Sequence, residues 1–143
     1  PIKIQTMKKC LLLLALVFSS LFASAQIDKI VGEWYTVDDE TGAVKALVDI
    51  YKGDDGLYYG KIIKVFKDGQ ENPNSDRKGL VIVKDMKAED GMLKGGTIYE
   101  PESGKTYYAK ISYNEADNTI TLRGSLDKRG WVGRSQTWIK ERK

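Results

Sequence analysis

The chain has 143 residues, about the length of one domain with a single hydrophobic core. It contains no histidine and one cysteine, Cys10, which excludes a catalytic triad that relies on an imidazole base. Three of the 23 basic residues, Lys3, Lys8 and Lys9, lie before residue 26, and the remaining 20 match the 20 acidic residues. The domain that follows is therefore electrically balanced, and no nucleic-acid partner is expected.

The first part of the chain has the features of a secretory leader. From Met7, "MKKCLLLLALVFSSLFASAQ" places two lysines before a short apolar run and then Ala-Ser-Ala, ending at Ala25. This order is typical of a signal peptide, and the apolar run is short for a membrane span. Cys10 precedes that run, whereas a lipoprotein cysteine would follow it, so no lipid anchor is expected. We predict cleavage after Ala25, which makes residues 1–25 the signal peptide with upstream residues. Residues 26–143 would then be a single periplasmic or secreted domain without a transmembrane span.

Short runs of alternating apolar and polar residues make up the rest of the chain. Between them lie clusters of Asp, Asn, Gly and Pro, which are typical of hairpin turns. The alternation is clearest in "TYYAKISY", where Tyr107, Ala109, Ile111 and Tyr113 share one face. The pattern predicts an all-β fold, a small antiparallel up-and-down β-barrel of about eight strands. The expected strands cover residues 30–37, 43–51, 57–66, 80–86, 92–100, 105–113, 119–126 and 131–141.

The longest connection runs from Lys67 to Gly79. It is polar and contains Pro73. We predict a flexible surface loop here, with a lid over one barrel mouth as the alternative.

Several stretches resemble one bacterial family. "GEWYT", "YYGKIIKV", "GGTIYEPESGKTYYAKI" and "GWVGRSQTWIK" are similar to the exported family called domain of unknown function 2147, over about Ile30 to Lys140. The resemblance implies a lipocalin-like β-barrel and no assigned reaction. Members often carry a cysteine pair after the third strand, which this chain lacks, so metal or redox ideas built on that pair do not transfer.

The resemblance also implies how the barrel closes. In lipocalin-like barrels a tryptophan of the first strand, here Trp34, packs against an arginine of the last strand. Arg134 is the candidate, and Trp138 belongs to the same closing seam. We expect Arg134 to stack on the indole of Trp34, with a direct role in ligand binding as the alternative. Arg123, by alternation, faces solvent.

Tyrosine is the residue type that most indicates a binding site. By alternation Tyr59, Tyr99, Tyr107 and Tyr113 occupy inward or rim positions. A tyrosine combines apolar area with a polar tip, which suits either a filled core or a pocket for a small ligand. An eight-stranded barrel allows both, and the number of large inward residues favours a filled or narrow interior.

The sequence favours a non-enzymatic exported barrel that binds a small amphipathic ligand or an envelope protein partner. No catalytic residue, metal ligand or cofactor is predicted. The alternative is a carboxylate-dependent envelope hydrolase acting on sugar or peptide material, with Glu33 or Asp49 as the inward-capable residue. Two acidic side chains converging in one cavity would distinguish the enzyme from the binding protein.

Overall fold

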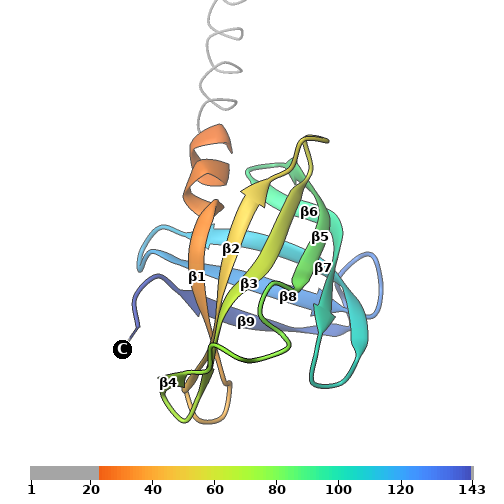
Figure 1. Ribbon diagram of the computed structural model, residues 1–143. Coiled ribbons are helices and arrows are strands. Elements are labelled where there is room, and N and C mark those ends of the chain that lie inside the picture. Colours follow the sequence, from red (N-terminus) through yellow and green to blue (C-terminus); the bar gives the residue numbers. More distant parts are fainter. Residues whose placement is uncertain (1–22, 143) are drawn as a thin grey trace, which may run out of the picture.

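The computed structural model describes residues 23–142 (Figure 1). The predicted leader up to residue 22 lies outside the described residues. A helix at residues 23–30 precedes nine strands. The strands are β1 (Gly32–Val37), β2 (Val44–Lys52), β3 (Tyr58–Lys67), β4 (Gln70–Glu71), β5 (Val81–Glu89), β6 (Met92–Glu100), β7 (Lys105–Asn114), β8 (Thr119–Ser125) and β9 (Gly133–Ile139).

Eight of these strands close into an antiparallel barrel, which confirms the predicted fold class. Neighbouring strands follow the order β2-β1-β9-β8-β7-β6-β5-β3, and pairing of β2 with β3 completes the ring. The short β4 pairs only with β3, outside the ring. Closure between β1 and β9 rests on one residue pair, Tyr35 with Ile139. The junction of the first and last strands is thus the shortest pairing of the barrel.

Side chains fill the middle of the barrel. The inward positions follow the period of two expected for strands. Ten large side chains there are less than 2 % exposed, and they come from the helix and from every barrel strand except β3, which contributes Tyr58 at 8 % and Ile62 at 4 %. They are Ile30, Trp34, Val48, Ile50, Met86, Val83, Leu93, Ile111, Ile120 and Trp138.

Two glycines in the middle of β6 mark an irregular part of the sheet. Gly95 has a φ of 79°, and the pairing of β6 with β7 shifts register between Leu93 and Gly96. A β-carbon on Gly96 would collide with the carbonyl of Lys84 and lie 2.6 Å from Sδ of Met86. Only glycine fits at Gly96, because the neighbouring strand occupies the space of a side chain.

The helix covers one end of the barrel, which we call the helix end. Figure 1 shows it directly before β1. Ile27 and Ile30, one helical turn apart, are 6 % and 0 % exposed and belong to the hydrophobic core. A β-carbon on Gly91, in the β5–β6 turn, would collide with the side chain of Gln26. The first strand therefore starts at Gly32 and not at residue 30 as expected, because Ile30 is buried as part of the helix.

The turns at residues 53–57, 90–91 and 115–118 also lie at the helix end. The opposite end carries the other connections, and we call it the loop end. These are the loops at 38–43, 68–80, 101–104 and 126–132. The connection Lys67–Gly79, predicted to be flexible, includes the β3–β4 hairpin, and the Gly79 amide donates to the carbonyl of Ile62 at 2.7 Å. This connection is therefore held to the backbone of β3 by hydrogen bonds.

Candidate functional site

Burial differs between the two ends of the barrel. Most of the fully buried side chains occupy the helix end and the middle, and Val83, the cross-strand partner of Ile98, is an exception. Five hydrophobic side chains pack on the core while staying partly exposed. Tyr113 is near the helix end, whereas Val65, Leu80, Ile98 and Tyr99 lie where β3, β5 and β6 reach the loop end. Tyr99 faces the other side of the sheet from Ile98, so we call Val65, Leu80 and Ile98 together with Tyr107 the loop-end layer. Its apolar surface is incompletely covered, so a ligand could bind there.

Tyr107 and Ile98 lie side by side within this layer. They are direct cross-strand partners, and Tyr107 shares its strand face with the buried Ala109 and Ile111. On the next strand, a β-carbon on Gly124 would lie 3.5 Å from Cβ of Tyr107 and 3.6 Å from Cγ2 of Ile98. Gly124 thus leaves ordinary contact space beside the ring of Tyr107, where a larger residue would reduce access to the layer.

Charged groups surround the loop end. Nζ of Lys45 lies 2.9 Å from Oε1 of Glu102 and 3.3 Å from Oδ2 of Asp38, which bridges two loops. The backbone amides of Thr41 and Glu40, followed by Lys45, lower the pKa of Asp38 to about 2. The hydrogen bond to Glu102 in turn raises the pKa of Lys45. Asp38 and Lys45 are therefore both charged near neutral pH.

Arg134 belongs to the loop end, which corrects the expectation that it stacks on Trp34. Its side chain is 78 % exposed, and Nη2 lies 3.8 Å from Oδ2 of Asp39. Arg134 is the cross-strand partner of Gly124, and Tyr35 pairs with Ile139 at the other end of the same strand. Six residues of strand, about 20 Å, separate Arg134 from the position opposite Trp34. A contact with the indole is geometrically impossible from there.

Lys140, and not Arg134, provides the cation beside Trp34. Its Nζ lies 4.2 Å from the ring centroid of Trp34 and donates to the carbonyl of Glu33 at 3.3 Å. Burial lowers the pKa of Lys140, and the charges of Glu33 and Asp49 oppose this effect. Strand alternation could have identified Lys140, because residues 134, 136, 138 and 140 share one strand face.

The two tryptophans of the expected seam lie in the core at the helix end. Trp34 is 0 % exposed, and its Nε1 donates to the carbonyl of Ile30 at 2.7 Å. Trp138 is 1 % exposed, and its Nε1 donates to Oε1 of Gln136 at 3.4 Å. The indole of Trp34 thus connects the helix to the first strand.

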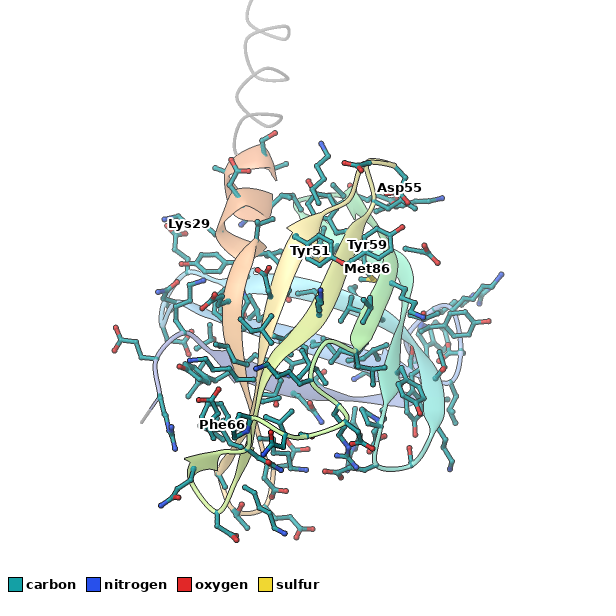
Figure 2. The ribbon with its side chains drawn as sticks, viewed as in Figure 1. Lys29, Tyr51, Asp55, Tyr59, Phe66 and Met86 are labelled. Atoms are coloured by element: carbon teal, nitrogen blue, oxygen red, sulfur yellow. The ribbon has the colours of Figure 1, made fainter. Side chains whose placement is uncertain are left out.

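Tyr59 lies on the outer face of the barrel, which corrects its predicted inward position. Its neighbours Tyr58 and Gly60 are buried, so the alternation of β3 turns Tyr59 outward. Its ring stacks on Tyr51 with centroids 6.0 Å apart, and its hydroxyl donates to Asp55 in the adjacent turn (Figure 2). The hydrogen bond to Asp55 raises the pKa of Tyr59 and lowers that of Asp55.

The four predicted tyrosines do not form one site. Tyr113 lies near the helix end, where its hydroxyl donates to Oδ1 of Asn118 at 3.0 Å. Tyr99 and Tyr107 lie at the loop end on the neighbouring strands β6 and β7. Tyr107 pairs with Ile98, so the two side chains share a face of the sheet. Tyr99 is the next residue after Ile98 and therefore points to the opposite face. Tyr107 is therefore the predicted tyrosine placed next to Gly124.

The carboxylates of the enzymatic alternative also face outward. Glu33 and Asp49 are cross-strand partners, and the residues that flank them, Trp34 and Val48, point into the core. Lys61 lies opposite Asp49 on the other side. Within residues 23–142 no group of three or more His, Cys, Asp or Glu side chains is arranged to hold a metal ion. In the same part of the chain no helix is long and apolar enough to cross a bilayer.

Comparison with known proteins agrees with this architecture. Residues 32–140 match the family model described as "Uncharacterized protein conserved in bacteria (DUF2147)". The chain belongs to this family. A solved structure, protein HP1028 from Helicobacter pylori, is described as belonging to the lipocalin family. It matches with a TM-score of 0.61 and 25% sequence identity, over 78% of this chain and 82% of that one. A search of curated proteins found no significant match.

This family member therefore has a lipocalin-like barrel, a fold consistent with ligand binding. Sequence reasoning missed Lys45, Ile98, Gly124 and Lys140 as residues that define the two ends. Their roles depend on which strand end each one occupies, and that requires the register of the closed barrel.

Proposed function

We propose that this protein is a non-enzymatic barrel that binds a small amphipathic molecule at its loop end. The observation that carries the proposal is the one-sided closure of the barrel. The helix, Trp34 and Lys140 cover one end, whereas the loop-end layer stays partly exposed. A ligand that covered this layer would remove apolar surface from water, which stabilises a complex by roughly 25 cal/mol per Å² before the costs of association.

The charges around the layer favour a ligand with an anionic head. Arg134 is the cross-strand partner of Gly124, which lies next to Tyr107 and Ile98. Its guanidinium therefore starts from the edge of the loop-end layer. Its contact with Asp39 is long, at 3.8 Å, and largely exposed. A planar guanidinium with exposed donors binds carboxylate, sulfonate or phosphate oxygens in a bidentate manner. The ligand would place its apolar body on Ile98 and Tyr107 and its head near Arg134.

A fluorescence titration with 1-anilinonaphthalene-8-sulfonate, an aromatic sulfonate, tests this site, with laurate as the competitor. The wild-type protein should bind the dye saturably, and laurate should displace it. Gly124→Val adds bulk beside Tyr107 in a residue type that strands accept well, and we expect dye affinity to fall about tenfold. Arg134→Gln should weaken binding about threefold to tenfold, because it removes the charge opposite the sulfonate.

The matched control is Tyr59→Phe on the outer face, which should leave the dye affinity unchanged. Circular dichroism of each variant separates loss of binding from loss of fold. Unchanged dye affinity in both Gly124→Val and Arg134→Gln would refute a loop-end site.

No observation favours the hydrolase alternative. It requires two carboxylates converging on one interior site, and Glu33 and Asp49 are on the outer face of β1 and β2. The predicted processing after Ala25 is compatible with the binding site, because the loop-end layer and its charged rim lie wholly within residues 26–143. Export to the periplasm or outside the cell remains part of the proposal, and intact-mass analysis of the protein from its native cell tests it.

A further inference from the structure

The β8–β9 loop, residues 126–132, exposes three large apolar side chains. Leu126 is 68 % exposed, Trp131 77 % and Val132 59 %. The other large hydrophobic residues exposed in the described chain, Val31 and Tyr108, reach only 37 % and 38 %. Figure 1 shows this loop projecting from the body of the barrel, where it joins β8 to β9 at the right of the view. Such a concentration of apolar groups on a projecting loop indicates an interaction surface.

Hydrogen bonds hold the loop in this conformation. The carboxylate of Asp127 accepts from the backbone amides of Val132 at 2.8 Å and Trp131 at 3.2 Å. These bonds, that to Val132 first, lower the pKa of Asp127, so the carboxylate stays charged as an acceptor. The hydroxyl of Ser125 donates to the Asp127 carbonyl at 2.8 Å. The exposed side chains are thus mounted on an ordered backbone.

Arg123 fixes the other side of the loop, which corrects its assignment as a free solvent-facing residue. Its Nε donates to the carbonyl of Gly130 at 2.6 Å, and Nη2 donates to that of Trp131 at 3.3 Å. Nη1 donates to Oγ of Ser135 on β9 at 3.3 Å. A surface loop with no binding role would not need this number of side-chain hydrogen bonds to fix its backbone. The anchoring preorganises the apolar groups for contact.

The charge of this region is unlike that of the rest of the chain. Residues 123–134 contain four basic side chains, Arg123, Lys128, Arg129 and Arg134, and one acidic side chain, Asp127, for a net charge of +3. Residues 26–143 as a whole contain equal numbers of acidic and basic residues. The carboxylate of Asp127 accepts hydrogen bonds from backbone amides of the loop. Lys128 and Arg129 are exposed beside Trp131.

We propose that the β8–β9 loop docks the protein onto the surface of an anionic phospholipid bilayer. Trp131, Leu126 and Val132 would enter the boundary between headgroups and acyl chains, where tryptophan is favoured. Lys128 and Arg129 would meet the anionic headgroups, at about 1 kcal/mol for each basic residue near such a surface. A protein partner fits less well, because a stable protein interface needs about 800 Å² on each side, far more than three side chains at a loop tip provide.

Vesicle binding tests this inference independently of the proposed ligand site. The predicted mature chain, residues 26–143, is sedimented with vesicles of phosphatidylcholine alone and with vesicles containing about one third phosphatidylglycerol. We expect binding to the anionic vesicles that falls as salt is raised, and about tenfold weaker binding to phosphatidylcholine alone. Trp34 and Trp138 are buried, so a blue shift of the tryptophan emission on binding would report Trp131 entering the interface.

Two pairs of variants divide the apolar from the electrostatic contribution. Trp131→Ser combined with Leu126→Ser should reduce binding to anionic vesicles at least about tenfold and leave its salt dependence in place. Lys128→Gln combined with Arg129→Gln should remove most of the salt dependence. The matched controls at the helix end are Val31→Ser and the pair Lys29→Gln and Lys52→Gln, which should bind as the wild type does.

Three results would overturn the proposal. One is failure of the wild-type chain to sediment with anionic vesicles at low salt. Another is unchanged binding in the Trp131 and Leu126 double variant. The third is self-association of the wild-type chain, measured by light scattering, that the double variant abolishes while vesicle binding is absent. That last result would assign the loop to a protein interface. Dye binding at the loop-end layer is expected to survive every one of these loop variants, so failure of one proposal does not imply failure of the other.

Discussion

The helix end and the loop end of this barrel are built from the same eight strands and differ in what covers them. At the helix end Ile27 and Ile30 add apolar side chains from outside the sheet, and Trp34 and Trp138 fill the space below them. At the loop end the connections are polar, and ion pairs such as Lys45 with Glu102 join them across the surface. One end is therefore closed by hydrophobic packing and the other is surrounded by charge.

The difference shows how stability and function can be separated within a small barrel. Buried aromatic and aliphatic groups at one end contribute most to the free energy of unfolding, because they remove the most apolar surface from water. The loop end contributes less and can expose Tyr107, Arg134 and the β8–β9 loop to partners. Substitutions should consequently affect stability at one end and binding at the other.

The largest expected effect is that of Trp34→Ala. Trp34 is fully buried, and its indole N–H satisfies the Ile30 carbonyl, so the substitution leaves both a cavity and an unpaired acceptor. We expect a loss of about 3–5 kcal/mol in the free energy of unfolding. Tyr107→Ala at the loop end should cost about 1 kcal/mol, since Tyr107 is already partly exposed. Urea unfolding followed by far-UV circular dichroism measures both, and equal losses would contradict the difference between the ends.

Removing the contribution of the helix should have the next largest effect. Ile30→Ala deletes a side chain with no exposure and should lower the free energy of unfolding by about 2–4 kcal/mol. The adjacent Val31 is 37 % exposed, and Val31→Ala should change stability by less than about 0.5 kcal/mol. Similar results for the two variants in the same urea experiment would mean that the helix does not seal the barrel.

The sequence predicts the strands well because each one has a clear alternation bounded by turn residues. It predicts the ends poorly, since both depend on register. Tyr58 and Tyr59 are adjacent tyrosines, and only the packing of Gly60 against Val83 decides which one points inward. Arg134 and Lys140 share a strand face, and only the pairing of Tyr35 with Ile139 decides which one reaches Trp34. The helix at residues 23–30 overlaps the predicted leader, whose composition gave no reason to expect a role in the core.

Because Lys140 and not Arg134 lies beside Trp34, substitutions of these two residues should have different effects on stability, although both effects are smaller than those above. Lys140→Ala removes the cation above Trp34 and the apolar stem that packs beside it, for an expected loss of about 1–2 kcal/mol. Arg134→Ala removes only an exposed pair with Asp39 and should cost less than about 0.5 kcal/mol. Lys140→Met retains the stem and should recover about half of the loss. Urea unfolding of the three variants distinguishes these outcomes, and a larger loss for Arg134→Ala would restore that residue to the closing seam.

The smallest expected effect concerns the charges of the loop end. Asp38 has a pKa of about 2 in the folded protein, whereas an unfolded chain gives about 3.9. A carboxyl group with a lowered folded pKa contributes stability that is present above its unfolded pKa and is lost as the pH falls through its folded pKa. The stability difference between wild type and Asp38→Asn should therefore be constant above about pH 5 and should vanish as the pH approaches 2. Urea midpoints measured across this range provide the test, with Asp54→Asn, an exposed substitution in the β2–β3 turn at the helix end, as the control for loss of one negative charge. A difference that stayed the same at pH 3 and pH 7 would show that the Asp38 carboxylate does not hold the β1–β2 loop through its charge.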